Sequence, residues 1–242
     1  MTESVANTLR EYALRYETAD FINGDPSWFM HQVQGVKNQE IMAFMAAGLS
    51  YGSRAQFLPK IQWLLDKADG QPDAWVREGA FREHLKPGDK SCFYRLYTKG
   101  EMFSFLAACQ KVLLEKGSLG EYVRASSCDA LSAVEAICGA FQSTAVVPQD
   151  AKSACKRVCM FLRWMVRDGS PVDLGLWPFL DKRTLIMPLD THVLTEAANL
   201  GLVTSRNASM SAAIKLTKAM AQIFPEDPLK GDFALFGYGV NH

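Results

Sequence analysis

The chain has 242 residues, which is enough for one large domain or two modest ones. Apolar residues make up 48% and charged residues 21%, a composition that excludes a disordered protein. Lysine and arginine total 26, and aspartate and glutamate total 26, so the formal net charge is zero. Any nucleic-acid contact must therefore come from clustered rather than overall positive charge.

Helical periodicity dominates the chain. Apolar residues recur at helical spacing from Gln39 to Ala68, and turn residues lie between Ser50 and Ser53, which predicts two helices joined there. No alternating apolar and polar segment is long enough for a sheet, so the predicted class is all-α. Further helices are predicted, in chain order, within 101–117, 128–144, 152–169, 192–202, 209–224 and 227–242, with loops at 84–92 and 169–180.

The chain carries no sign of export or of a membrane anchor. Its N-terminal segment has no basic region leading into an apolar one, and nowhere do about 18 apolar residues follow one another. We therefore expect a cytoplasmic protein with no membrane partner.

The cysteines do not form a metal-binding pattern. Cys155 and Cys159 are four residues apart and share a helical face, but no further cysteine or histidine lies nearby. We expect structural free thiols, which pack as small apolar side chains, and no metal site. The six positions are Cys92, Cys109, Cys128, Cys138, Cys155 and Cys159.

Asp190 is an acidic residue directly after the apolar segment 185–189 and directly before a helical pattern. At that position its side chain can cap the helix, because a carboxylate oxygen accepts a bond from an otherwise unpaired backbone N–H. It can equally be a catalytic carboxylate held at the end of a helix. The residues alone leave both interpretations open.

Four basic residues recur at a spacing that places them on one stripe of a helix: Lys152, Lys156, Arg163 and Arg167. Such a stripe is most often a solvated face. Here the remaining circumference is largely apolar, and a lysine on a nearly buried helix loses its proton more easily because burial disfavours the charged amine. A lysine of this stripe is therefore a candidate nucleophile.

Two motifs carry a resemblance to helix-hairpin-helix DNA glycosylases and glycosylase/lyases of the GPD superfamily. PLDTHVLTEAANLGL resembles the segment in which a catalytic aspartate opens a helix, and CKRVCMFLRWMVR resembles the helix with the catalytic lysine. The spacing of Lys156 and Asp190 is similar to that in the archaeal 8-oxoguanine glycosylase branch. Over nearly the whole chain, FINGDP, AAGLSYGSR, FLRWMVR, VDLGLW, PLDTHV and DFALFGYG together resemble a bacterial family of unknown function assigned to that superfamily.

The resemblance implies two helical lobes with a cleft between them, one formed by 38–165 and the other by 1–37 and 166–242. It implies base-excision repair of damaged duplex DNA, with an oxidised purine as the first expectation for the lesion. Lys156 would attack the sugar C1′ and form a Schiff base that permits abasic-site lyase activity, and Asp190 would stabilise the cationic sugar. If both groups act on one sugar, the Lys156 amine should lie within about 8 Å of the Asp190 carboxylate.

The chain departs from this pattern in two places. Many members have a glycine-rich hairpin before the lysine, whereas the corresponding VVPQDAKSACKR contains no glycine, so the hairpin is degenerate and Lys152 stays open beside Lys156 as the reactive lysine. No cysteine follows Cys159, so no iron–sulfur cluster and no other cofactor is expected.

Further site residues follow from the resemblance, each beside an ordinary structural interpretation. The turn residues Ser50, Tyr51, Ser53 and Arg54 would line the DNA gap or form a simple helix turn. Asp232 and Phe236 would read and stack on the base, or pack in the core. Lys152, Arg163 and Arg167 would complete the DNA-binding patch, and His192 is expected to be packed. The alternative function is a non-catalytic helical DNA-binding or scaffold protein that keeps the glycosylase fold.

Overall fold

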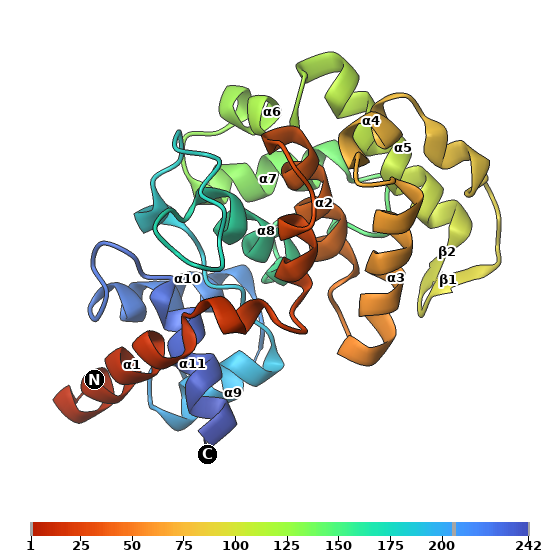
Figure 1. Cartoon of the computed structure of the whole chain (residues 1–242). Coiled ribbons are helices and arrows are strands. Elements are labelled where there is room, and N and C mark those ends of the chain that lie inside the picture. Colours follow the sequence, from red (N-terminus) through yellow and green to blue (C-terminus); the bar gives the residue numbers. More distant parts are fainter. Residues whose placement is uncertain (1, 205–206, 242) are drawn as a thin grey trace. The chain divides into compact units, whose positions relative to one another are not determined.

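The structure of the protein is a computed structural model, which describes residues 2–204 and 207–241. Most of this chain is helical, and the predicted all-α class is confirmed (Figure 1). The chain forms two compact units. Unit 1 consists of 1–21, 128–134 and 151–242, and unit 2 of 22–127 and 135–150.

Unit 2 is built around a helix that is buried on all sides. Helix α2 spans Val36–Leu49, and each of its residues from Glu40 to Leu49 is buried, as expected for a helix at the centre of a core. The rings of Phe44, Phe105 and Phe141 pack together beside it. The other helices of the unit are η2 (Pro26–His31), α3 (Arg54–Lys67), α4 (Pro72–Arg77), η3 (Ala80–Glu83), α5 (Lys99–Lys116) and α6 (Leu119–Ser126).

Two local signals fix helix ends in unit 2. Thr98 and Glu101 form a capping box at the start of α5, and Gly117 ends that helix in a positive-φ conformation, as the sequence predicts. The buried Glu40 carboxylate accepts hydrogen bonds from the backbone N–H groups of Leu119 (2.7 Å) and Gly120 (3.0 Å), and so anchors the start of α6 to α2.

Unit 2 also contains a short β-hairpin that the sequence pattern does not indicate. Strands β1 (Cys92–Tyr94) and β2 (Tyr97–Thr98) pair antiparallel, with Cys92 opposite Thr98. Strands of two or three residues are too short to show the apolar and polar alternation by which strands are recognised.

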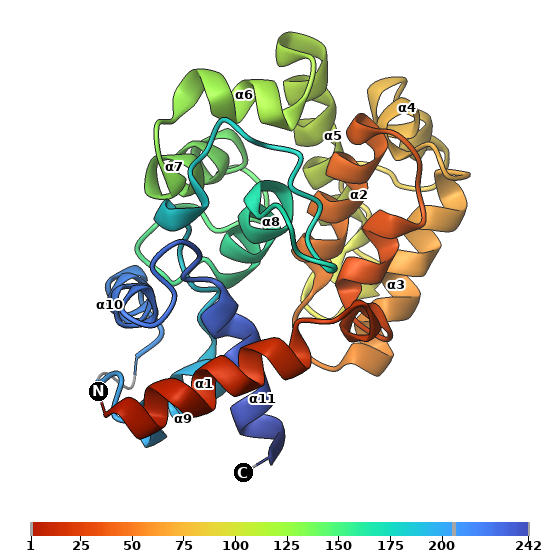
Figure 2. The ribbon, with the colours of Figure 1, turned by 60° about the vertical axis from the view of Figure 1, so that its left-hand side comes forward.

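Unit 1 joins both ends of the described chain. Helix α11 (Lys230–Asn241) packs against α1 (Glu3–Tyr16) and α9 (Thr191–Asn199), and the first two of these lie side by side in Figure 2. The unit also contains α8 (Lys156–Val166), η4 (Lys182–Thr184) and α10 (Met210–Ala221). Helix α7 (Ala130–Ala140) contributes to both units, and η1 (Ala19–Ile22) lies at their boundary. Helices α1, α4 and α6 were not predicted.

The unit boundaries differ from the predicted lobe boundaries at two segments. Residues 22–37 lie in unit 2, and α8 lies in unit 1. Helix α8 belongs to unit 1 because its arginines pair with aspartates from later segments of the same unit. Lys156 and Asp190 are therefore in one unit.

The helices of the described chain are too short or too polar to cross a membrane.

Candidate lysine and aspartate site

The backbone around Lys156 is held on both sides. Cys155 adopts a left-handed conformation (φ 44°) and precedes α8, of which Lys156 is the first residue. Just upstream, the Lys152 carbonyl accepts a hydrogen bond from the backbone N–H of Met210 (3.2 Å), and Ser153 forms an isolated bridge with Ser209. The start of α8 is thereby fixed against the start of α10.

Asp190 contacts two different donors, one with each carboxylate oxygen. Its Oδ1 accepts the backbone N–H of Val193 at 2.8 Å and so caps α9. Its Oδ2 accepts a hydrogen bond from Lys156 Nζ at 2.6 Å. The expected cap and the expected proximity of the two catalytic candidates are both confirmed.

The pair is accessible to solvent. The Lys156 side chain is 38% exposed and that of Asp190 34% exposed. Burial raises the pKa of the Asp190 carboxyl, but the Lys156 charge and hydrogen bond, together with the Val193 N–H, outweigh burial and leave this pKa below its usual value. Asp190 is thus a carboxylate that keeps its charge, next to an amine that a reactant can approach.

A second carboxyl acts on the same pair. Asp232, in the first turn of α11, accepts a hydrogen bond from Arg163 Nη1 and interacts electrostatically with Lys156 and Asp190. Burial and the Asp190 charge raise the pKa of Asp232, and the opposing influence of Arg163 and Lys156 does not cancel that rise. The two carboxyls beside Lys156 therefore have pKa values displaced in opposite directions.

The predicted basic stripe requires a correction at its two arginines. Arg163 is only 4% exposed and Arg167 only 1%, so neither guanidinium belongs to a surface patch. Arg163 pairs with Asp232 and, at 3.2 Å, with the buried Asp173, which also accepts a bond from Arg167. Helical spacing gave the stripe correctly, but it could not show that carboxylates from distant segments cover it.

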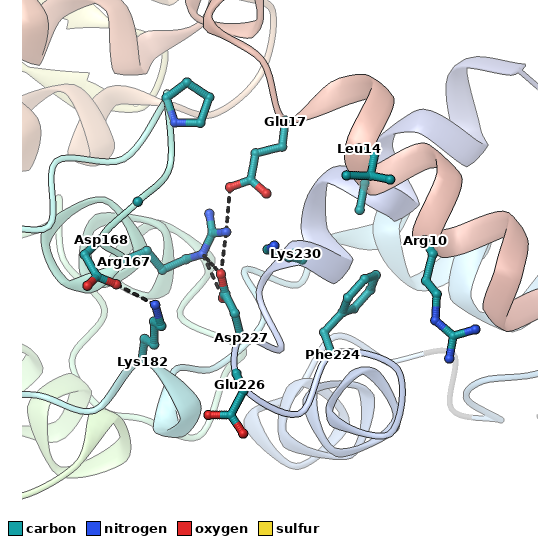
Figure 3. A pocket seen from close by; sticks show the side chains of 13 residues that line it. Arg10, Leu14, Glu17, Arg167, Asp168, Lys182, Phe224, Glu226, Asp227 and Lys230 are labelled. Carbon is teal, nitrogen blue, oxygen red and sulfur yellow. Dashed lines mark hydrogen bonds and ion pairs between the residues drawn. The ribbon is translucent and has the colours of Figure 1, made fainter.

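Arg167 lies in the wall of a pocket of about 630 Å³ in unit 1 (Figure 3). Its guanidinium bonds to Asp227 through Nε (2.9 Å) and Nη2 (2.8 Å), and to Glu17 through Nη2 (2.6 Å). Figure 3 shows these contacts at the centre of the pocket and the Lys182–Asp168 ion pair at its edge. We call Glu17, Arg163, Arg167, Asp173, Asp227 and Asp232 the ion network.

Phe236 lies in an aromatic cluster of unit 1. Its ring makes edge contacts with Phe21 (5.1 Å between centroids) and Tyr16 (5.6 Å). Packing accounts for this residue without a bound base. His192, by contrast with the expectation of a packed residue, is 63% exposed, and its Nδ1 lies 3.9 Å from Glu196.

The turn residues predicted to line a DNA gap lie in unit 2. Ser50 is buried, and its hydroxyl donates to the Ala46 carbonyl (2.6 Å), as a turn residue would. Ser53 occupies the N-cap position of α3 without a side-chain cap bond. Arg54 is half exposed and lies 3.5 Å from Asp25.

Tyr51 ties the same turn to the β-hairpin. Its hydroxyl donates to the Tyr94 carbonyl (3.4 Å), and the Tyr94 hydroxyl donates back to the Tyr51 carbonyl. The Arg95 guanidinium lies over the Tyr51 ring, 5.6 Å from its centroid. Tyr51 therefore has a structural role in unit 2.

The sequence analysis missed the acidic members of the ion network and the partner of Arg54. These acids are separated from the arginines that they bind by loops or by most of the chain, so no local spacing relates them. VDLGLW contains one of them, but within that motif an aspartate resembles any turn residue. The missed residues are Glu17, Asp25, Asp173 and Asp227.

Two further observations bear on cofactors. Within residues 2–204 and 207–241, no three histidine, cysteine or acidic side chains are grouped so that they could hold a metal ion. All six cysteines are free thiols, of which Cys92 and Cys128 are exposed.

Comparison with known proteins gives a family and no relative of known activity. A family model described as a protein of unknown function (DUF2400) matches residues 25–241. No curated protein and no solved structure matches the chain significantly. Because the family model covers most of the sequence, the chain belongs to the DUF2400 family.

Proposed function

We propose that this protein is a base-excision DNA glycosylase with abasic-site lyase activity, in which Lys156 is the nucleophile. The observation that carries the proposal is the contact between Lys156 Nζ and the Asp190 carboxylate at 2.6 Å, on a side-chain pair that remains open to solvent. A partly exposed amine beside a rigidly held carboxylate is what attack on a sugar carbon requires.

The surroundings of Lys156 favour loss of its proton. As the first residue of α8 it lies at the positive end of the helix dipole, which disfavours a cation there. Once the amine attacks C1′ of a damaged nucleotide, positive charge develops on the sugar, and the fixed negative charge of Asp190 stabilises it. Asp190 is suited to this because the α9 cap holds it in place.

The substrate class is damaged duplex DNA, with an oxidised purine as the first lesion to test. Such enzymes extrude the target nucleotide, and unstacking costs a few kcal/mol, less for a damaged base. Lys152 and Arg54 are exposed cations available for phosphate contacts, each on its own unit.

Borohydride trapping tests the proposal. The parent protein is incubated with duplexes containing an abasic site, 8-oxoguanine or uracil, and a Schiff base is reduced to a covalent adduct. We expect an adduct with the parent and with Lys152→Ala, and none with Lys156→Ala. An adduct that disappears only in Lys152→Ala would move the nucleophile to that residue, and the absence of any adduct would refute the lyase activity.

The second candidate is a non-catalytic DNA-binding or scaffold protein. The burial of Arg163 and Arg167 favours it, because two cations of the predicted DNA-binding patch are committed to the ion network. A parent that binds duplex DNA but neither excises a base nor forms an adduct would select this candidate.

A further inference from the structure

Attack by Lys156 requires that its ammonium first give up a proton to some acceptor. Asp190 is the nearest carboxylate, but both of its oxygens are occupied, one by the Lys156 ammonium and the other by the Val193 N–H. The carboxylate also has to remain charged when the sugar becomes cationic. A different group is therefore needed to take the proton.

Asp232 satisfies the requirements for such a group. It lies within electrostatic range of both Lys156 and Asp190, and its side chain is 16% exposed, so it is more buried than either. Arg163, seven residues after Lys156 on α8, holds one of its oxygens. The groups that act on Asp232 are thus Arg163 and Lys156 from α8 and Asp190 at the start of α9.

The charge balance behind Asp232 also favours uptake of a proton. The ion network contains two guanidinium groups and four carboxylates, and Asp173 is shared between the two arginines. Neighbouring carboxylates in a poorly hydrated environment resist simultaneous ionisation. Asp232 is the member of this network that interacts with Lys156, so it is where a proton from the lysine would enter.

We propose that Asp232 accepts the proton that Lys156 releases and passes it to the departing base, with Arg163 as the positioning residue that holds Asp232 for both transfers. This inference rests on the function proposed above. One Nζ–H bond breaks and an O–H bond forms on Asp232. The Nζ lone pair then bonds to C1′, the glycosidic electron pair leaves with the base, and Asp232 protonates that base. Opposite displacement of two neighbouring carboxyl pKa values is the usual sign of such a division of roles.

The resemblance to glycosylases assigns Asp232 instead to recognition of the damaged base, and an abasic substrate separates the two roles. An abasic site has no base to recognise, but Lys156 must still lose a proton before it forms a Schiff base. The experiment is single-turnover borohydride trapping on an abasic duplex between about pH 5 and 9, with the parent, Asp232→Asn, Asp232→Glu and Arg163→Lys.

We expect Asp232→Asn to slow trapping by about 100-fold or more, the lower end of what general acid–base groups contribute. Its remaining rate should rise steadily with pH, because hydroxide then removes the proton. Asp232→Glu should recover most of the rate with a shifted pH midpoint, and Arg163→Lys should shift that midpoint as well. Affinity for a duplex with a tetrahydrofuran abasic analogue should be unchanged in Asp232→Asn. Asp168→Asn, at a 74% exposed carboxyl, is the matched control and should trap like the parent.

Trapping by Asp232→Asn at the parental rate with the parental pH profile would overturn the inference and leave the proposed function standing. Loss of 8-oxoguanine excision with normal abasic trapping would also overturn it, in favour of base recognition. No adduct even with the parent would refute the proposed function itself. If Asp232→Asn does not fold, the parental profile decides, since a rate that rises with hydroxide over the whole range excludes a titrating acceptor.

Discussion

Asp190 holds Lys156 and the first turn of α9 at the same time, with Oδ2 bound to Nζ at 2.6 Å and Oδ1 bound to the Val193 N–H at 2.8 Å. The two oxygens therefore serve separate purposes, one in the chemistry and one in the fold. Substitutions that remove the charge or the whole carboxylate should distinguish these purposes.

Asp190→Asn should separate stability from activity. The amide oxygen can still cap α9, because Asn and Asp are near-equal N-caps, and the lost ion pair is partly exposed. We expect the free energy of unfolding to fall by at most about 1 kcal/mol. Schiff-base trapping should nevertheless be almost abolished, because an amide cannot offset a cationic sugar. Thermal unfolding and trapping on the same preparation measure both effects.

Asp190→Ala provides the comparison, since it removes the cap as well and should cost about 1 kcal/mol more than Asp190→Asn. An Asp190→Asn protein with parental trapping would show that Asp190 is only a helix cap.

The Lys156–Asp190 pair should contribute to stability only above acidic pH. The pKa of Asp190 is lowered in the folded protein, so the folded state binds fewer protons than the unfolded one, and stability falls as pH falls. The contribution should be complete above about pH 4, near the unfolded value, and disappear as pH falls through the folded-state pKa. Urea unfolding of the parent and of Lys156→Met between pH 2 and 7 should show curves that converge in acid.

Lys215→Met is the matched control for this measurement, because Lys215 is an exposed residue of α10. Its difference from the parent should not depend on pH in this window. Parallel curves for the parent and Lys156→Met would contradict the assigned ion pair.

Arg167 should be among the most important side chains for the stability of unit 1. It is 1% exposed and pairs with Glu17, Asp173 and Asp227. Arg167→Met leaves three buried carboxylates without their cation, which should cost about 3–5 kcal/mol. Arg167→Lys should also destabilise, because one ammonium cannot reproduce the planar set of donors that the guanidinium offers. Chemical unfolding measures both variants.

Arg183→Lys is the control for Arg167, since its ion pair with Asp181 is exposed, and we expect a change within about 0.5 kcal/mol. Equal effects at the two positions would contradict a structural role for the ion network.

The sequence predicted those features that depend on local spacing. Helices α2 and α3, their junction and the end of α5 at Gly117 follow from apolar periodicity and turn chemistry. The cap at Asp190 is likewise local. Whether a basic residue is exposed depends on which distant segment packs over it, and the loop containing Asp173 covers Arg163 without any signal in the helix itself.

The same distinction applies within the candidate site. The proximity of Lys156 to Asp190 was predicted from resemblance to a family with that pair, since periodicity alone does not bring α8 to α9. The participation of Arg163 could not be predicted, because it depends on α11 placing Asp232 beside it.

The correction at Arg163 and Arg167 changes the expected salt dependence of DNA binding. Affinity for duplex DNA should fall with salt by roughly 0.9 log units per log unit for each phosphate contacted, and only exposed cations contribute. Lys152 is exposed at the start of the lysine segment, so Lys152→Met should reduce the slope by about 1, weakening binding similarly for all sequences. Arg167→Lys should leave the slope unchanged wherever the protein remains folded.

Fluorescence anisotropy with an undamaged duplex at several salt concentrations measures these slopes, and Lys215→Met is the control for a cation on another helix. A slope that falls in Arg167→Lys as much as in Lys152→Met would show that the buried guanidinium becomes available to DNA. Binding that does not depend on salt in the parent would contradict phosphate contact altogether, because every neutralised phosphate releases counterions. That result would count against both the glycosylase and the non-catalytic DNA-binding protein, since the two share this first step.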